Sequence, residues 1–293
     1  MEIIYWNIGK DVGPEKFKHK ILENLLNEIK PNVLCIAEGT RSKDDCENLI
    51  LTITSLGYTL YYSPTFTSDP KYNLKYPYKP EGLKIFIKNT SDLYVPFTFD
   101  LQKENGRIVA AHTLLNEKIV TLLFVHNYSK NGDKMVTSDQ ISFISNLSEW
   151  IHLKGGIVKK SDKHSIIGDF NLEPWDYILR RDHNKSINSY FFTKHFEQEK
   201  KRRLHKSQGR EFYFNPLLEH LIPNNETNLG GTYYSSSYGW ALYDYAISSK
   251  NCSTNIKVIT QTKSYIFVDS AKEQASNFLK HGFDHLPIQI TIS

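Results

Sequence analysis

The stretch Ser165-Ile166-Ile167-Gly168-Asp169-Phe170-Asn171 determines how the rest of this sequence is interpreted. Its apolar run ends at a glycine, and an acid and an amide follow two positions apart. Side chains alternate between the two faces of a strand, so Asp169 and Asn171 are predicted to project on the same side. The glycine lets a second backbone, or a bound phosphate, come close. Carboxylate and amide oxygens suit a hard metal ion, although a plain strand-to-turn exit would have the same pattern.

The composition is that of an ordinary globular protein. The chain has 293 residues, of which 40% are hydrophobic and 23% charged, enough for a sizeable core. A net charge of +4 permits a polyanionic partner without requiring one. The three cysteines, Cys35, Cys46 and Cys252, have no metal-binding spacing and indicate free thiols. The sequence has no long apolar run and begins directly on a strand-like segment, so we expect a cytoplasmic protein without membrane contact.

Hydrophobic periodicity predicts many short strands with helices between them. Helices are expected at 14–29, 43–55 and 137–153, since apolar residues recur there at helical spacing. The dipeptide Asn116-Glu117 predicts a tight hairpin. Strands are expected at 2–8, 33–37, 58–63, 82–88, 107–115, 118–127, 164–169, 231–235, 240–248, 256–260, 264–268 and 286–292. We therefore expect two packed mixed sheets flanked by helices, in one domain spanning 1–293 with surface insertions near 64–80 and 176–230.

Polar residues recur where these predicted strands end. A carboxylate inside or beside an apolar run costs free energy unless it is paired or bound to a metal. So many cases at strand ends predict one shared polar site. The residues concerned are Asn7, Glu38, His126, Asn127, Asp169, Asn171, Asp244, Asp284 and His285.

This ordered set resembles the endonuclease/exonuclease/phosphatase superfamily, which includes exonuclease III and the pancreatic-type deoxyribonucleases. The motifs that carry the resemblance are Trp6-Asn7, Glu38, Gly168-Asp169-Phe170-Asn171, Asp244-Tyr245 and Asp284-His285-Leu286-Pro287. They span nearly the whole chain. The resemblance implies a four-layer α/β sandwich in which two mixed, mostly antiparallel sheets pack face to face, with the active site at one end. Ala37 and Phe283 depart from the usual neighbours of the metal-binding Glu and the final Asp-His, which leaves the subfamily open.

The resemblance also implies a metal site and a water-activating group. Glu38 is expected to bind Mg²⁺ directly, with Asn7 and Asp284 supporting the metal, and Mn²⁺ is expected to substitute. Asp169 is expected to orient or deprotonate the attacking water, and Asn171 to hold a phosphate oxygen.

Two histidines complete the expected catalytic group. His285 is expected to contact the scissile phosphate, and Asp244 to orient its ring. His126 is assigned to leaving-group protonation or phosphate contact. Which of these residues is the general base stays open.

Three further residues are candidates for substrate binding. Arg107 and Lys130 are expected to contact flanking phosphates, although either could be a solvated charge. Trp240 belongs to an aromatic cluster that could line a groove or simply belong to the core. The basic run at 200–206 could lie against a nucleic-acid backbone.

Three functions fit this sequence. The leading hypothesis is a monomeric Mg²⁺-dependent nuclease that hydrolyses the phosphodiester bonds of DNA by in-line attack of water. The second is a phosphatase or phosphodiesterase that acts on a small-molecule or lipid phosphate, although the inositol 5-phosphatase pattern is missing at 239–244. The third is a catalytically silent binding module, against which the presence of all four site acids argues.

Overall fold

The computed structural model describes the elements that build the sheets and the helices, but not every connection between them. The described residues are 1–9, 15–39, 43–62, 82–89, 106–129, 136–152, 163–174, 176, 179, 213–215, 217, 231–235, 239–249, 252–263, 265–267 and 283–293. The expected insertion at 64–80 and the basic run at 200–206 lie outside them, as does most of 176–230. The single-domain boundary stays a prediction.

The first sheet has six strands in the order β12-β13-β1-β2-β4-β3. β1 and β2 run parallel, and every other neighbouring pair is antiparallel. Apolar side chains on both faces of the central strands bury this sheet on both sides. The strands are β1 (Glu2–Asn7), β2 (Val33–Ala37), β3 (Tyr58–Tyr62), β4 (Lys84–Lys88), β12 (Thr254–Val258) and β13 (Ile288–Ile292).

The second sheet has five strands in the order β5-β6-β7-β11-β8. Here β6 and β7 are the parallel pair, and the other neighbours are antiparallel. The strands are β5 (Ile108–Leu115), β6 (Lys118–His126), β7 (Lys163–Asp169), β8 (Tyr213–Phe214) and β11 (Asp244–Ser249). A separate two-stranded ribbon pairs β9 (Tyr233–Ser235) with β10 (Gly239–Ala241).

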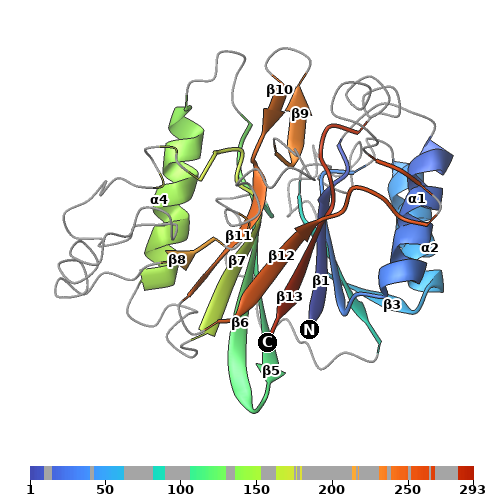
Figure 1. Cartoon of the computed structure of the whole chain (residues 1–293), viewed down its shortest axis with the longest axis horizontal. Coiled ribbons are helices and arrows are strands. Elements are labelled where there is room, and N and C mark those ends of the chain that lie inside the picture. Colours follow the sequence, from blue (N-terminus) through green and yellow to red (C-terminus); the bar gives the residue numbers. More distant parts are fainter. Residues whose placement is uncertain are drawn as a thin grey trace, which may run out of the picture.

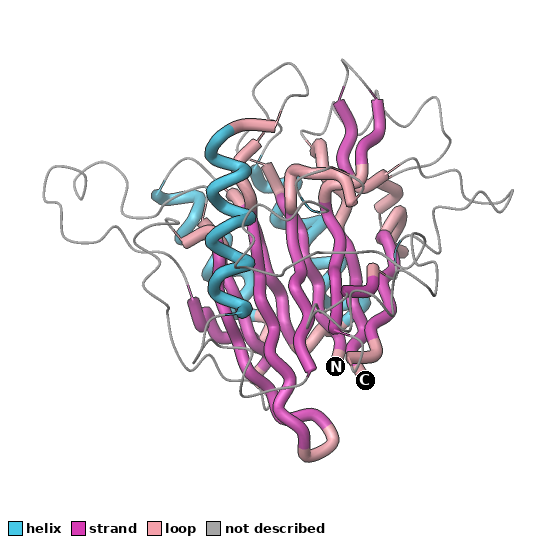
Figure 2. Tube along the Cα trace, turned by 90° about the vertical axis from the view of Figure 1, so that its left-hand side faces the viewer, coloured by secondary structure: helices cyan, strands magenta, loops and turns pink. Residues whose placement is uncertain are grey.

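The two sheets pack face to face, and helices cover their outer faces (Figure 1). Helices α1 (Glu15–Ile29) and α2 (Lys43–Ser55) lie on the first sheet, and α4 (Ser138–His152) lies on the second. Figure 2 shows α4 in front of the strands that it covers. One apolar cluster fills the space between the sheets and continues between the second sheet and α4, and a second cluster lies between the first sheet and its helices. The predicted four-layer α/β sandwich is confirmed.

The β5–β6 hairpin forms as the sequence predicts. Asn116 and Glu117 adopt φ values of 51° and 64°, as both central residues of a tight type I′ turn must. The strands pair in register from Ile108 opposite Val125 to Leu115 opposite Lys118.

Two predicted strands differ from the structure, and one observed strand was not predicted. The strand expected at 240–248 is two strands, because the chain leaves the ribbon at Leu242 and enters the second sheet at Asp244. Of the strand expected at 264–268, the structure describes 265–267, where Ile266 makes an isolated bridge to Gln261. Strand β8 was not predicted, because two residues carry no readable periodicity. Among the described residues, no helix is both long and apolar enough to cross a membrane.

Candidate active site

Sheet pairing brings the polar strand ends together at one end of the sandwich. Because β6 and β7 run parallel, His126 and Asp169 reach the same edge and lie opposite each other in register. Asp244 begins antiparallel β11 and pairs with Asp169 from the other side. A Cβ on Gly168 would lie 1.9 Å from the main-chain oxygen of Val125, so this close strand pairing requires glycine. This end lies opposite the two chain termini (Figure 1).

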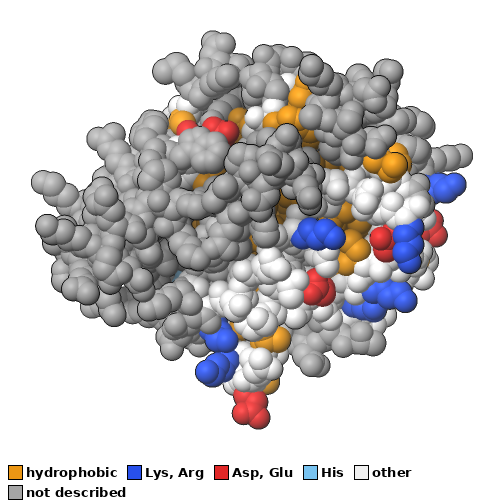
Figure 3. All heavy atoms as spheres, viewed as in Figure 1, with side chains coloured by type: hydrophobic (Ala, Val, Ile, Leu, Met, Phe, Trp, Pro, Cys, Tyr) orange, Lys and Arg blue, Asp and Glu red, His pale blue; other side chains and the backbone are white. Residues whose placement is uncertain are grey.

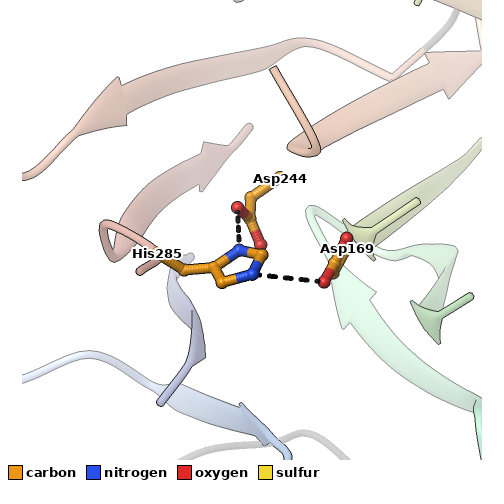
Figure 4. A group of neighbouring side chains, drawn as sticks. All are labelled: Asp169, Asp244 and His285. Atoms are coloured by element: carbon orange, nitrogen blue, oxygen red, sulfur yellow. Dashed lines mark hydrogen bonds and ion pairs between the residues drawn. The ribbon is translucent and has the colours of Figure 1, made fainter. Parts of the chain in front are cut away.

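Three buried side chains, Asp169, Asp244 and His285, lie together at this edge, joined by one hydrogen bond and one longer ion-pair contact (Figure 4). His285 Nδ1 lies 2.7 Å from Asp244 Oδ2, and His285 Nε2 lies 3.8 Å from Asp169 Oδ2. Ligand atoms of all three lie within 4.8 Å of one another, close enough to hold a metal ion. The 2.7 Å separation is nevertheless that of a hydrogen bond, which makes this group a carboxylate-imidazole-carboxylate array. The ring of Tyr233 packs beside the imidazole, with centroids 4.7 Å apart.

Two asparagines hold the carboxylate of Asp169. Asn7 Nδ2 donates to Asp169 Oδ2 at 3.0 Å, and the main-chain N–H of Asn171 donates to Oδ1 at 2.7 Å. Asn171 adopts φ 48°, a left-handed conformation that turns its side chain toward the carbonyl of Asn127, to which Nδ2 donates at 3.0 Å. Both carboxylate oxygens of Asp169 therefore have donors, which fixes the rotamer of the side chain.

His126 connects Glu38 to this group. Its Nε2 lies 3.7 Å from Glu38 Oε1 and 4.0 Å from Asp169 Oδ2. On its other side, Arg107 Nη1 lies 3.5 Å from Nδ1. A guanidinium only donates, so this contact assigns Nδ1 as the acceptor and places the proton on Nε2, facing the site. His126 and His285 thus approach the same oxygen of Asp169.

The charges of this group shift one another's pKa values. Burial, followed by the negative charge of Asp244, raises the pKa of Asp169 to about 7, and His285 and the donors from Asn7 and Asn171 oppose this rise. Burial also raises the pKa of Asp244. For His285, burial lowers the pKa, but Asp244, Asp169 and Asp284 outweigh it and raise the value well above 6.5. The array therefore favours an imidazolium between two acids.

The residues expected to hold a metal ion have suitable donor atoms. Asp284 Oδ1 is buried and accepts no hydrogen bond from the described residues, which is costly for a carboxylate oxygen unless a cation meets it. The side chain of Glu38 is 18% exposed and faces the same region through His126. Asn7 Oδ1 accepts from the N–H of Gly9 at 3.0 Å and keeps a second lone pair. These hard oxygen donors fit Mg²⁺ or Mn²⁺.

The structure does not bring the expected substrate-binding residues together in one group, as it does the catalytic residues. Arg107 is 6% exposed, and it donates to the carbonyls of His126 and Asn127, both at 3.3 Å. Its guanidinium also lies 4.4 Å from the centroid of the Tyr128 ring. Trp240 is half-buried and makes an edge contact with Tyr234 on the β9–β10 ribbon. Their contacts with substrate stay predictions, and Lys130 lies outside the described residues.

Two supporting residues escaped the sequence-based prediction. Gln140 closes a reciprocal cap with Thr137 at the start of α4, and its Nε2 donates to the carbonyls of Tyr128 and Asn171. The hydroxyl oxygen of Thr232 accepts from the N–H of Asp244 at 2.8 Å. The Thr-x-x-Gln cap at 137–140 is a readable signal for the first residue, but nothing local marks the second.

The comparisons with known proteins agree with this geometry at the level of the fold. No family model matches the sequence, and the search of curated proteins finds no significant match. Among solved structures, TDP2 of D. rerio in complex with a single-strand DNA product is 12% identical, with a TM-score of 0.57 over 100% of this chain and 98% of that one. An endonuclease/exonuclease/phosphatase family protein from Leptotrichia buccalis is 17% identical, with a TM-score of 0.52 over 100% and 99% of the two chains. A mannosyl-6-phosphatase of Bacteroides thetaiotaomicron is 11% identical, with a TM-score of 0.54 over 100% and 99%.

The chain therefore has the fold of the endonuclease/exonuclease/phosphatase superfamily, as its ordered motifs predict. These identities establish the fold alone, since one fold can carry many different chemistries.

Proposed function

We propose that this protein is a divalent-metal-dependent phosphoesterase, and that it acts as a nuclease on DNA. The observation that carries the proposal is the Asp169–His285–Asp244 array, which places a held carboxylate and a carboxylate-backed imidazole beside each other at a strand-end edge. A carboxylate and an imidazole in this arrangement suit general acid–base chemistry at phosphorus.

The residues of the array divide the proton transfers between them. Ionised Asp169, fixed by Asn7 and Asn171, accepts the proton of the attacking water. His285, kept protonated by Asp244, donates to a non-bridging phosphate oxygen as negative charge develops there. The Nε2–H of neutral His126 points toward the same region and donates a hydrogen bond to the leaving oxygen, which takes up its proton from solvent water.

A divalent ion held by Glu38 and Asp284, with Asn7 in support, would supply positive charge at the phosphate and lower the pKa of nearby acids. Since the pKa of Asp169 is raised to about 7 by burial first, such a charge would favour its ionised form at neutral pH. The metal is thus expected to help prepare the base as well as to stabilise the phosphate.

Three features favour nucleic acid as the substrate. The chain is basic, with a net charge of +4, and one similar structure, TDP2 of D. rerio, was solved with a single-strand DNA product. The ring of Tyr233, on the β9–β10 ribbon, lies next to His285 of the site. The face seen in Figure 3 adds no further support, because its described basic and acidic side chains are interspersed and form no large patch of one sign.

A second candidate is a phosphatase that acts on a small-molecule phosphate monoester. The likeness to a mannosyl-6-phosphatase over 100% of this chain favours it, and the same catalytic array could serve both reactions. The monomeric state and the cytoplasmic location are further parts of the proposal.

A substrate panel tests the proposal and separates the two candidates. The purified chain is incubated with circular, linear and single-stranded DNA, with RNA, and with sugar phosphates, in Mg²⁺ and in EDTA. We expect Mg²⁺-dependent cleavage of DNA, lost on the order of 10²-fold or more in Asp169→Asn. Asp139→Asn, the same change at an exposed site on α4, is the matched control and keeps full activity. Release of phosphate from sugar phosphates with intact DNA would establish the second candidate, and no hydrolysis of any substrate would refute both.

A further inference from the structure

Lys84 is a buried cation beside the proposed metal-binding residue Glu38. Its side chain is 1% exposed, and no other lysine in the described part of the chain is buried. It lies in the apolar run Leu83-Lys84-Ile85-Phe86-Ile87, at the start of β4. Because β4 is antiparallel to β2 and Lys84 pairs with Ile36, its ammonium reaches the end of β2, where Glu38 follows.

The ammonium binds the backbone of the turn that carries Glu38. Nζ donates to the main-chain oxygen of Glu38 at 2.8 Å and makes a longer contact of 3.5 Å with the oxygen of Gly82. A bond to the backbone fixes the direction of the Cα–Cβ bond, and this direction determines where the carboxylate can reach. Side-chain alternation places Lys84 on the same face as Phe86, which packs toward the helices. Lys84 therefore holds the turn from the side of the helix layer.

This turn needs a restraint. Glu38 has φ 59° and Gly39 has φ 128°, so two consecutive residues occupy the left-handed region. A residue with a Cβ adopts this conformation only when its surroundings compensate for the strain. A Cβ on Gly39 would lie 3.3 Å from Nζ of Lys84, so the turn closes directly over the ammonium. The conformation of Glu38 and the position of Lys84 thus depend on each other.

We infer that Lys84 is a positioning residue, whose ammonium holds the Glu38–Gly39 turn in the conformation that presents the Glu38 carboxylate to a divalent cation. This inference rests on the proposed function, because it takes Glu38 as a metal ligand. Lys84 itself does not contact the metal or the substrate. Burying a lysine costs free energy, which a merely structural position could avoid with an apolar side chain of the same length.

The direction in which metal affinity changes on replacing Lys84 shows whether the residue positions Glu38 or acts only through its positive charge. A positive charge near a metal site repels the cation, so removal of the charge alone would tighten metal binding. Removal of the restraint on the turn would weaken binding, because residues that orient metal ligands typically contribute 10–100-fold to affinity. Lys84→Met removes the charge and the donors but keeps an unbranched side chain of similar length.

The experiment is a titration of Mn²⁺ alone into the full-length, metal-free protein, followed by calorimetry, with the melting temperature measured in EDTA. We expect Kd to rise about 10-fold or more in Lys84→Met, while the melting temperature in EDTA stays the same or rises. Lys88→Met, at the far end of the same strand, is the matched control and keeps the wild-type Kd. Unchanged or tighter Mn²⁺ binding in Lys84→Met would overturn the inference.

Two further variants keep the outcome decisive. If Lys84→Met does not fold, Gly39→Ala disturbs the same turn without removing the charge; it is expected to weaken Mn²⁺ binding, and a wild-type Kd would overturn the inference. Glu38→Gln distinguishes the positioning role of Lys84 from the role of Glu38 as a metal ligand. If Glu38→Gln weakens binding and Lys84→Met does not, only the role of Lys84 fails; if Glu38→Gln binds Mn²⁺ like wild type, the metal assignment itself fails.

Discussion

Asp244→Asn tests the central array, because it changes one charge and keeps the size of the side chain. Asp244 is fully buried, and its Oδ2 lies 2.7 Å from His285 Nδ1. Burial lowers the pKa of His285, and Asp244 is the largest of the effects that raise it. In the variant an amide oxygen still accepts from Nδ1–H. The effect of burial, which lowers the pKa of His285, is then opposed by fewer negative charges. The pKa of His285 therefore falls, and its imidazolium form becomes less populated.

The cost to stability is expected to be small and the cost to activity large. A hydrogen bond to a charged group contributes about 1.5–3 kcal/mol and a neutral one about 0.5–1.5 kcal/mol, so the exchange costs about 1–1.5 kcal/mol. At about 2–4 °C per kcal/mol for chains of roughly this size, the melting temperature falls by a few degrees. Loss of the imidazolium that stabilises developing charge is expected to reduce kcat on the order of 10²–10⁴-fold.

Steady-state hydrolysis of the preferred substrate in Mg²⁺, together with thermal unfolding, separates the two effects. Ser248→Ala is the matched control, because Ser248 lies on the same strand and is equally buried. Its hydroxyl bonds Ser165 at 2.8 Å and Thr254 at 2.7 Å, away from the site. The melting temperature of Ser248→Ala should fall by about as much as that of Asp244→Asn, while its kcat stays at the wild-type value. An Asp244→Asn enzyme within about threefold of wild-type kcat would refute the assigned role of the array.

Three further predictions concern stability. Gly168→Ala should destabilise the protein by about 3 kcal/mol or more, seen as a lower urea midpoint, because the added Cβ would lie 1.9 Å from the Val125 carbonyl oxygen; an unchanged midpoint would contradict this strand geometry. In EDTA, Asp169 and His285 both have higher pKa values in the folded protein than in the unfolded chain. The stability that Asp169 contributes is therefore lost as pH rises from about 4 to about 7, and that from His285 is lost at higher pH. Asp169→Asn should flatten this pH dependence of the melting temperature between pH 4 and 7, and an identical slope would show that the carboxyl titrates normally. Mg²⁺ at about 100 times its Kd should stabilise the wild type by about 2.7 kcal/mol and Glu38→Gln much less; equal stabilisation would exclude Glu38 as a ligand.

Several features of this protein follow from local sequence. Asn116-Glu117 occupies the turn conformation that only a few residue pairs favour, so the hairpin is readable from two residues. The apolar run before Gly168 marks β7, and the period of 3.6 marks α4, because each signal lies within one segment. The order of the polar strand ends likewise identifies the superfamily fold.

Only the tertiary structure decided how these residues meet. Asn7 and Asp169 are 162 positions apart, and their 3.0 Å hydrogen bond exists because the two sheets face each other. The sequence likewise places Arg107 at a strand start, but only strand pairing sets its guanidinium beneath His126 rather than in solvent. Lys84 shows the same limit, since its partner, the Glu38 carbonyl, belongs to the turn after a neighbouring strand. Periodicity is encoded within a segment, whereas contacts across strands depend on register and on the packing of distant segments, which no local pattern specifies.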